Sequence, residues 1–62
     1  MSNIHIDAQI ACVKREIRMR EQTYPRWVSS GKMKQEVADI ETARMRAVLE
    51  TLMEIEKKGR LL

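Results

Sequence analysis

One short stretch, residues 24–31, constrains the fold of this chain more than any other. It holds the only proline, both aromatic residues and one of the two glycines. Pro25 lacks a backbone N–H and disfavours helix at Tyr24, so a helix should end or kink there, and a further short turn after it fits equally well. Gly31 can close a helix in the left-handed conformation. Because charged, apolar-striped segments flank this corner, we predict an all-α, two-helix antiparallel hairpin.

The first predicted helix covers about residues 4–23. Asp7, or Asn3 before it, is the expected N-cap. Apolar residues recur at spacings of three, four and seven, which is typical of a coiled-coil-like seam. The seam comprises Ile6, Ile10, Val13, Ile17, Tyr24 and Trp27.

Arg20 is the charged interruption of this seam. Folding the chain near residue 30 brings Arg20 level with Glu41, and Glu16 is a second acid within reach. We expect an Arg20–Glu41 ion pair that fixes the register of the two helices, because polar residues on seams often set alignment. The alternative is an arginine that binds a ligand.

The second predicted helix follows a corner at residues 24–33 and covers about 34–58, with Gly59 as its C-cap. Lys34 stands where a capping Ser or Thr is expected. The segment has no Gly or Pro for more than 20 residues and is rich in strong helix formers. Its apolar surface is too wide for one neighbouring helix.

Two overlapping stripes make up this surface, and one hairpin can cover only one of them. The stripe expected to pack on the first helix is Val37, Ile40, Ala47, Val48, Leu52 and Ile55. The second stripe is Ala38, Met45, Leu49, Leu52 and Met53, and its residues Met45, Leu49, Leu52 and Met53 are expected to form a dimer interface. An uncovered stripe would leave a sizeable apolar patch in water, so we expect two hairpins to dimerise into a four-helix bundle.

The chain length of 62 residues points the same way. It allows a single domain over residues 1–62, and a core of this size barely offsets the chain entropy. With Cys12 and His5 as the only residues of their types, the sequence predicts neither an internal disulfide nor a zinc site. It has no run of about 18 apolar residues and no signal-peptide pattern, so we expect a cytoplasmic protein without membrane or cofactor partners.

Charge is distributed unevenly along the chain. Residues 14–34 contain seven Lys or Arg and two Glu, whereas residues 35–56 contain six acids and two Arg. One interpretation is a basic helix lying antiparallel to an acidic one. The other is a basic stripe for nucleic acid or an acidic protein surface.

Motifs of known chemistry are not found in the sequence. No catalytic triad, phosphate-binding glycine loop or di-metal helix motif is present, so we expect no catalytic, metal or cofactor residues and no enzyme activity. Residues 31–40 look like the opening of a helix-turn-helix, but the pattern then continues as helix without the turn that precedes a recognition helix.

The segment 13–20, the Tyr24-Pro25-Arg26-Trp27-Val28 corner and the Gly31-Lys32-Met33 triplet resemble small helical-hairpin proteins of bacteriophages and prophages. The resemblance extends over about two-thirds of the chain, through Ala38, Glu41, Met45 and residues 47–49. It implies a phage setting and the cytoplasm of the host cell, and it assigns no activity to particular residues.

We therefore expect a non-enzymatic phage accessory protein that binds and modulates, for example inhibits, a host defence or regulatory protein. The alternative is a nucleic-acid-associated protein that uses the basic first helix, with weak binding to phosphates. Trp27 is either a contact residue or a plug for the open end of the hairpin. The expected contact residues are aromatic and basic, as interface anchors commonly are. They are Arg15, Arg18, Tyr24, Arg26, Trp27 and Lys32.

Overall fold

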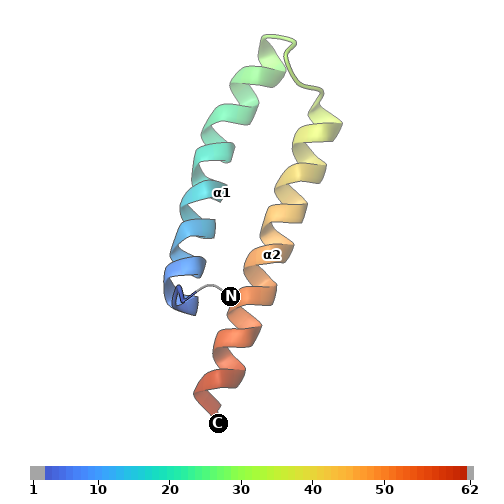
Figure 1. The fold of residues 1–62 in the computed structure, drawn as a ribbon. Coiled ribbons are helices and arrows are strands. Elements are labelled where there is room, and N and C mark those ends of the chain that lie inside the picture. Colours follow the sequence, from blue (N-terminus) through green and yellow to red (C-terminus); the bar gives the residue numbers. More distant parts are fainter. Residues whose placement is uncertain (1–2, 62) are drawn as a thin grey trace.

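A computed structural model describes residues 3–61 and confirms the two-helix hairpin (Figure 1). Helix α1 spans Ile6–Ser29 and helix α2 spans Gln35–Leu61. The two helices run antiparallel, side by side, and the chain turns between them at one end. Positions 1, 2 and 62 of the expected domain lie outside the described residues.

Helix α1 begins one residue beyond a histidine cap. The Nδ1 atom of His5 accepts a hydrogen bond from the Asp7 N–H at 3.1 Å, and the His5 carbonyl accepts from the N–H groups of Ala8 and Gln9. The prediction of Asp7 or Asn3 as the cap is therefore wrong. Asp7 lies instead in the first turn, where its negative charge favours the N-terminal end of the helix dipole.

Helix α1 continues through Pro25 to Ser29, so the predicted end at residue 23 is wrong. Proline removes one helical hydrogen bond, that to the carbonyl of Glu21. The turn that follows is held at its end, because the Trp27 carbonyl accepts hydrogen bonds from the N–H groups of Lys32 and Met33 at 2.9 and 3.2 Å. The connection thus anchors the helical turn that lies beyond the proline.

Gly31 reverses the chain after α1. Its φ of 81° confirms the predicted left-handed conformation. The N–H of Ser30 donates to the Arg26 carbonyl, and the N–H of Gly31 donates to the Val28 carbonyl. These bonds satisfy carbonyls that the end of a helix leaves without partners.

Helix α2 begins without a side-chain cap and ends later than predicted. The Lys34 carbonyl accepts from the N–H groups of Val37 and Ala38, each at 3.1 Å. Gly59 lies inside the helix and not at its cap, which corrects the predicted end at residue 58. An ion pair between Glu56 and Arg60, 2.7 Å long and one turn apart, spans the glycine and supports this last turn.

The two helices pack along a seam with very little buried surface. Ile17 and Ala38 are the buried apolar residues of the described chain, at 6% and 4% exposure. Half-buried residues continue the seam on both helices at spacings of three and four. On α1 they are Ile6, Ile10, Val13, Arg20, Tyr24 and Val28, and on α2 they are Thr42, Met45, Leu49, Leu52 and Glu56.

This seam reverses the predicted roles of the two α2 stripes. Met45, Leu49 and Leu52, expected at a dimer interface, are half-buried on the face of α2 that continues from Ala38 toward α1. The stripe expected against α1 is largely exposed: Val37, Ile40, Ala47, Val48 and Ile55. Periodicity could not separate the stripes, because both are apolar and they share Leu52. On α1, the helix that continues through Pro25 brings Val28 onto the seam in place of Trp27.

The hairpin is long and thin, with extents of 47 × 19 × 18 Å. Its radius of gyration is 14.4 Å, whereas a compact domain of this length would have about 10.6 Å. A single pair of helices forms one layer, so each helix keeps most of its circumference in water. The candidate functional residues are therefore distributed over the long sides of the rod.

Candidate interaction surfaces

One long side of the hairpin is marked by an ion pair that crosses between the helices. Nη2 of Arg46 on α2 lies 3.1 Å from Oε1 of Glu21 on α1. Met53 lies seven residues after Arg46, two helical turns along α2, and shares this side. We call it the ion-pair side.

The opposite side carries exposed apolar residues from both helices. On α1, these residues lie on the flank of the seam opposite to the flank that holds Glu21. On α2, they lie on the flank opposite to the one that holds Arg46. Because Glu21 and Arg46 meet on one side, the other two flanks must share the second side. We call this second side the apolar face. Its large exposed residues are Trp27 of α1 and Val37, Val48 and Ile55 of α2. Met19 and Ile40 each follow a buried seam residue by two positions and lie toward the outer side of their helices.

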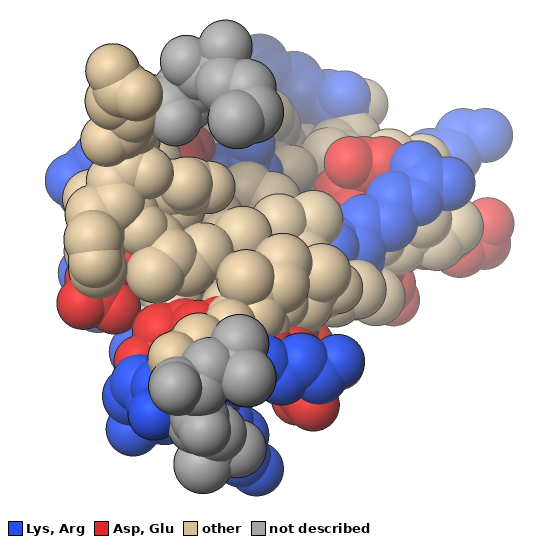
Figure 2. All heavy atoms as spheres, turned by 60° about the horizontal axis from the view of Figure 1, so that its bottom comes forward, with Lys and Arg blue, Asp and Glu red and all other residues tan. Residues whose placement is uncertain are grey.

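Figure 2 shows the hairpin from its open end, where uncharged side chains form a continuous area and Lys, Arg, Asp and Glu gather around its margins. The exposed apolar residues of the apolar face come from both helices. A contiguous apolar area on a small protein usually marks a contact with another molecule.

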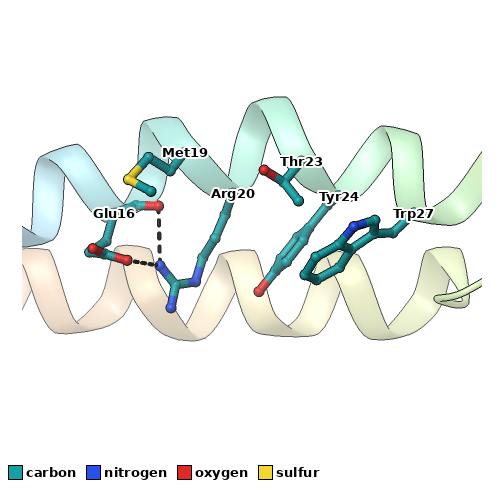
Figure 3. A pocket seen from close by; sticks show the side chains of 6 residues that line it. All are labelled: Glu16, Met19, Arg20, Thr23, Tyr24 and Trp27. Atoms are coloured by element: carbon teal, nitrogen blue, oxygen red, sulfur yellow. Dashed lines mark hydrogen bonds and ion pairs between the residues drawn. The ribbon is translucent and has the colours of Figure 1, made fainter.

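A shallow groove lies in the apolar face near the middle of α1 (Figure 3). It has a volume of about 260 Å³ and is lined by one helix only. The rings of Tyr24 and Trp27 lie 6.0 Å apart, tilted by 36°, and the tyrosine ring points toward α2. The groove is smaller than the ~300–1,000 Å³ of typical ligand pockets, and a single apolar side chain from another molecule matches it better. The lining residues are Glu16, Met19, Arg20, Thr23, Tyr24 and Trp27.

Arg20 pairs with Glu16 and not with Glu41, which corrects the predicted ion pair. Nη1 of Arg20 lies 2.6 Å from Oε2 of Glu16 and also donates to the Glu16 carbonyl at 3.2 Å. Glu41 pairs with Arg44 at 2.8 Å on its own helix. The hydrogen bond that Arg20 donates to the Glu16 carboxylate raises the pKa of the Arg20 guanidinium, burial opposes this, and Tyr24 adds a smaller increase. The helix that supplies Arg20 therefore also neutralises it.

Three arginines lie on the side of α1 that faces away from α2. Arg15, Arg18 and Arg26 are exposed and follow each other at helical spacing over about 16 Å. Arg15 donates to the Cys12 sulfur at 3.8 Å, and none of the three forms an ion pair with a described carboxylate. We call them the arginine stripe.

The arginine stripe changes the interpretation of the charge pattern. The ion pair that joins the helices uses a base of α2 and an acid of α1, the reverse of a basic helix neutralised by an acidic one. The sequence-based expectation that α2 neutralises the basic residues of α1 is therefore wrong for Arg15, Arg18 and Arg26.

The predicted contact residues thus separate into two groups. Tyr24 and Trp27 line the groove, whereas the three arginines form the stripe on another side of α1. Lys32 is exposed in the connection between the helices. Sequence reasoning missed Val37 and Ile55 as exposed members of one surface, although their apolar character and spacing were visible.

Among residues 3–61, no group of three or more His, Cys, Asp or Glu could hold a metal ion. The Cys12 thiol is exposed. No helix within the same range has the length and apolar character needed to cross a membrane. Comparisons with protein-family models, curated proteins and solved structures found no match.

Proposed function

We propose that this protein is a non-enzymatic binding protein that docks onto an acidic surface of another protein through its arginine stripe. The observation that carries the proposal is the exposure of Arg15, Arg18 and Arg26 on one side of α1 without carboxylate partners among the described residues. Arginine is enriched at protein interfaces, where its planar guanidinium forms bidentate hydrogen bonds to carboxylates. An unpaired arginine also loses no existing ion pair when it binds.

The biological setting of the proposal rests on the sequence resemblance described above. In the cytoplasm of a phage-infected bacterium, the partner would be a host defence or regulatory protein whose activity changes when the hairpin covers its acidic surface. A rigid helix presents its arginines at fixed spacing, which limits the entropy lost on binding.

A capture experiment tests this proposal. The full chain is immobilised and exposed to nuclease-treated bacterial lysate, and bound proteins are quantified by mass spectrometry at low and high salt. We expect acidic proteins to bind the wild type and to be lost from a variant with Arg15→Gln, Arg18→Gln and Arg26→Gln, because their salt-sensitive contacts are removed.

The matched control carries Lys34→Gln, Lys57→Gln and Lys58→Gln. It loses the same three positive charges away from the stripe and should retain the captured proteins. Equal loss from both variants would show a general charge effect, and capture that survives in the stripe variant would contradict the proposal.

Nucleic-acid binding is the second candidate, and the same unpaired arginines favour it. They could contact successive phosphates, but residues 3–61 form no helix beyond α1 and α2 that could read bases in a groove. We therefore expect micromolar or weaker affinity at ~150 mM salt, falling steeply as salt rises. A gel-shift assay with duplex and single-stranded oligonucleotides separates the candidates. Nanomolar or sequence-dependent binding would favour nucleic acid as the main partner.

A further inference from the structure

The hairpin exposes more surface than a folded chain of its mass normally does. Its solvent-accessible area is 5225 Å² for 7.3 kDa, whereas a folded monomer of this mass exposes about 4,200 Å². The excess of roughly 1,000 Å² is close to the ~800 Å² that each partner buries in a standard protein interface. One contact of ordinary size would bring the exposed area to the normal value.

The location of that contact follows from the exposed apolar residues. The apolar face defined above brings Trp27 of α1 onto the same side as Val37, Val48 and Ile55 of α2. On the ion-pair side, Met53 is the large exposed apolar residue, beside charged Glu21 and Arg46. The two sides therefore differ in how much apolar area a partner could cover.

We propose that a second copy of this chain covers the apolar face, so that two hairpins form a symmetric four-helix bundle. The proposal is independent of the arginine stripe, which lies on another side of α1 and stays exposed in such a bundle.

A second copy fits this face for two reasons. With Ile17 and Ala38 as its buried apolar residues, the described hairpin has too small a core for independent stability, and its own copies are present wherever it is synthesised. The charged groups at the middle of the face are internally balanced, since Glu16 pairs with Arg20 and Glu41 with Arg44. A face without net charge at its centre can meet itself without like-charge repulsion.

Two exposed residues of α2 give a matched test of the face. Val48 lies on the apolar face and is 47% exposed, while Met53 lies on the ion-pair side and is 46% exposed. Either can become lysine in the isolated hairpin without burying the new charge. Only Val48→Lys would bury a lysine in the proposed bundle, and we expect it to raise the dimer dissociation constant at least ~30-fold.

Light scattering on the full chain at ~5 to ~500 µM provides the first measurement, with thermal melting over the same range as the second. Wild type and Met53→Lys should show twice the 7.3 kDa chain mass and a melting temperature that rises with concentration. Val48→Lys should be a monomer, or should unfold at concentrations at which Met53→Lys is a folded dimer. The proposal is overturned by a wild type of one chain mass throughout, by a trimer or larger assembly, or by equal behaviour of the two variants.

Discussion

At the residue scale, Arg20 shows how local geometry can decide between two partners that the sequence offers equally. Its position on the seam and the presence of acids at Glu16 and Glu41 were predictable. The choice between them was not predictable from the sequence: in the structure Arg44 pairs with Glu41 at 2.8 Å, and Arg20 pairs with Glu16. A pair one turn apart on one helix also needs no alignment between helices.

A double-mutant cycle measures this choice as a coupling free energy. Glu16 precedes Arg20 by four residues, the favourable order on a helix, but the side chains are 37% and 34% exposed. We therefore expect a coupling of about 0.3–0.5 kcal/mol between Glu16→Ala and Arg20→Ala in urea denaturation at fixed protein concentration. The cycle of Arg20→Ala with Glu41→Ala serves as control and should be additive within error. A larger coupling to Glu41 than to Glu16 would contradict the observed pairing.

At the element scale, both helices were predictable and most of their ends were not. Dense helix formers and apolar spacing indicated the two helices, and Gly31 indicated the reversal between them. Local propensity predicts helix ends at Pro25 and Gly59, because each residue disfavours a helix. Both are tolerated, since the Trp27 carbonyl is satisfied by the connection and the Glu56–Arg60 pair supports the last turn. These compensations depend on partners that local propensity does not include.

The start of α2 gives a prediction at this scale. The Lys34 carbonyl is the first acceptor of the helix, but its side chain cannot accept a hydrogen bond from the first-turn N–H groups. Lys34→Ser adds a hydroxyl acceptor and should stabilise the protein by about 0.5–1 kcal/mol, seen as a higher melting temperature at constant concentration. Lys32→Ser, the same change within the connection, is the control and should have little effect. Equal stabilisation by both changes would argue for relief of positive charge and against capping.

At the scale of the whole molecule, the sequence predicted that α2 has a wider apolar surface than one hairpin can cover. The stripe predicted to pack against α1 was the wrong one. Helix-wheel reasoning allows either α2 stripe to face α1, because Leu52 belongs to both. The structure packs Met45 and Leu49 toward α1 and leaves Val37, Val48 and Ile55 exposed. Ala38 is 4% exposed on the seam, and the side-chain packing that buries it is not part of a periodicity argument.

This reversal also changes how the contact surfaces divide. The groove beside Tyr24 and Trp27 becomes part of the proposed self-association face, so another protein must be bound elsewhere. The arginine stripe meets that requirement, because it lies on the side of α1 away from α2. Self-association and partner binding can then occur together, and variants of one surface should leave the other intact.

The single tryptophan allows the most direct test of the proposed bundle. Trp27 lies on the apolar face and is 43% exposed in the hairpin. Acrylamide quenches the fluorescence of an indole ring that it can reach, so the quenching constant reports how far the ring is covered. At a concentration where Met53→Lys is a folded dimer, we predict a quenching constant at least ~3-fold lower in wild type and Met53→Lys than in Val48→Lys, because a second hairpin covers Trp27. Equal quenching in all three proteins would contradict the four-helix bundle.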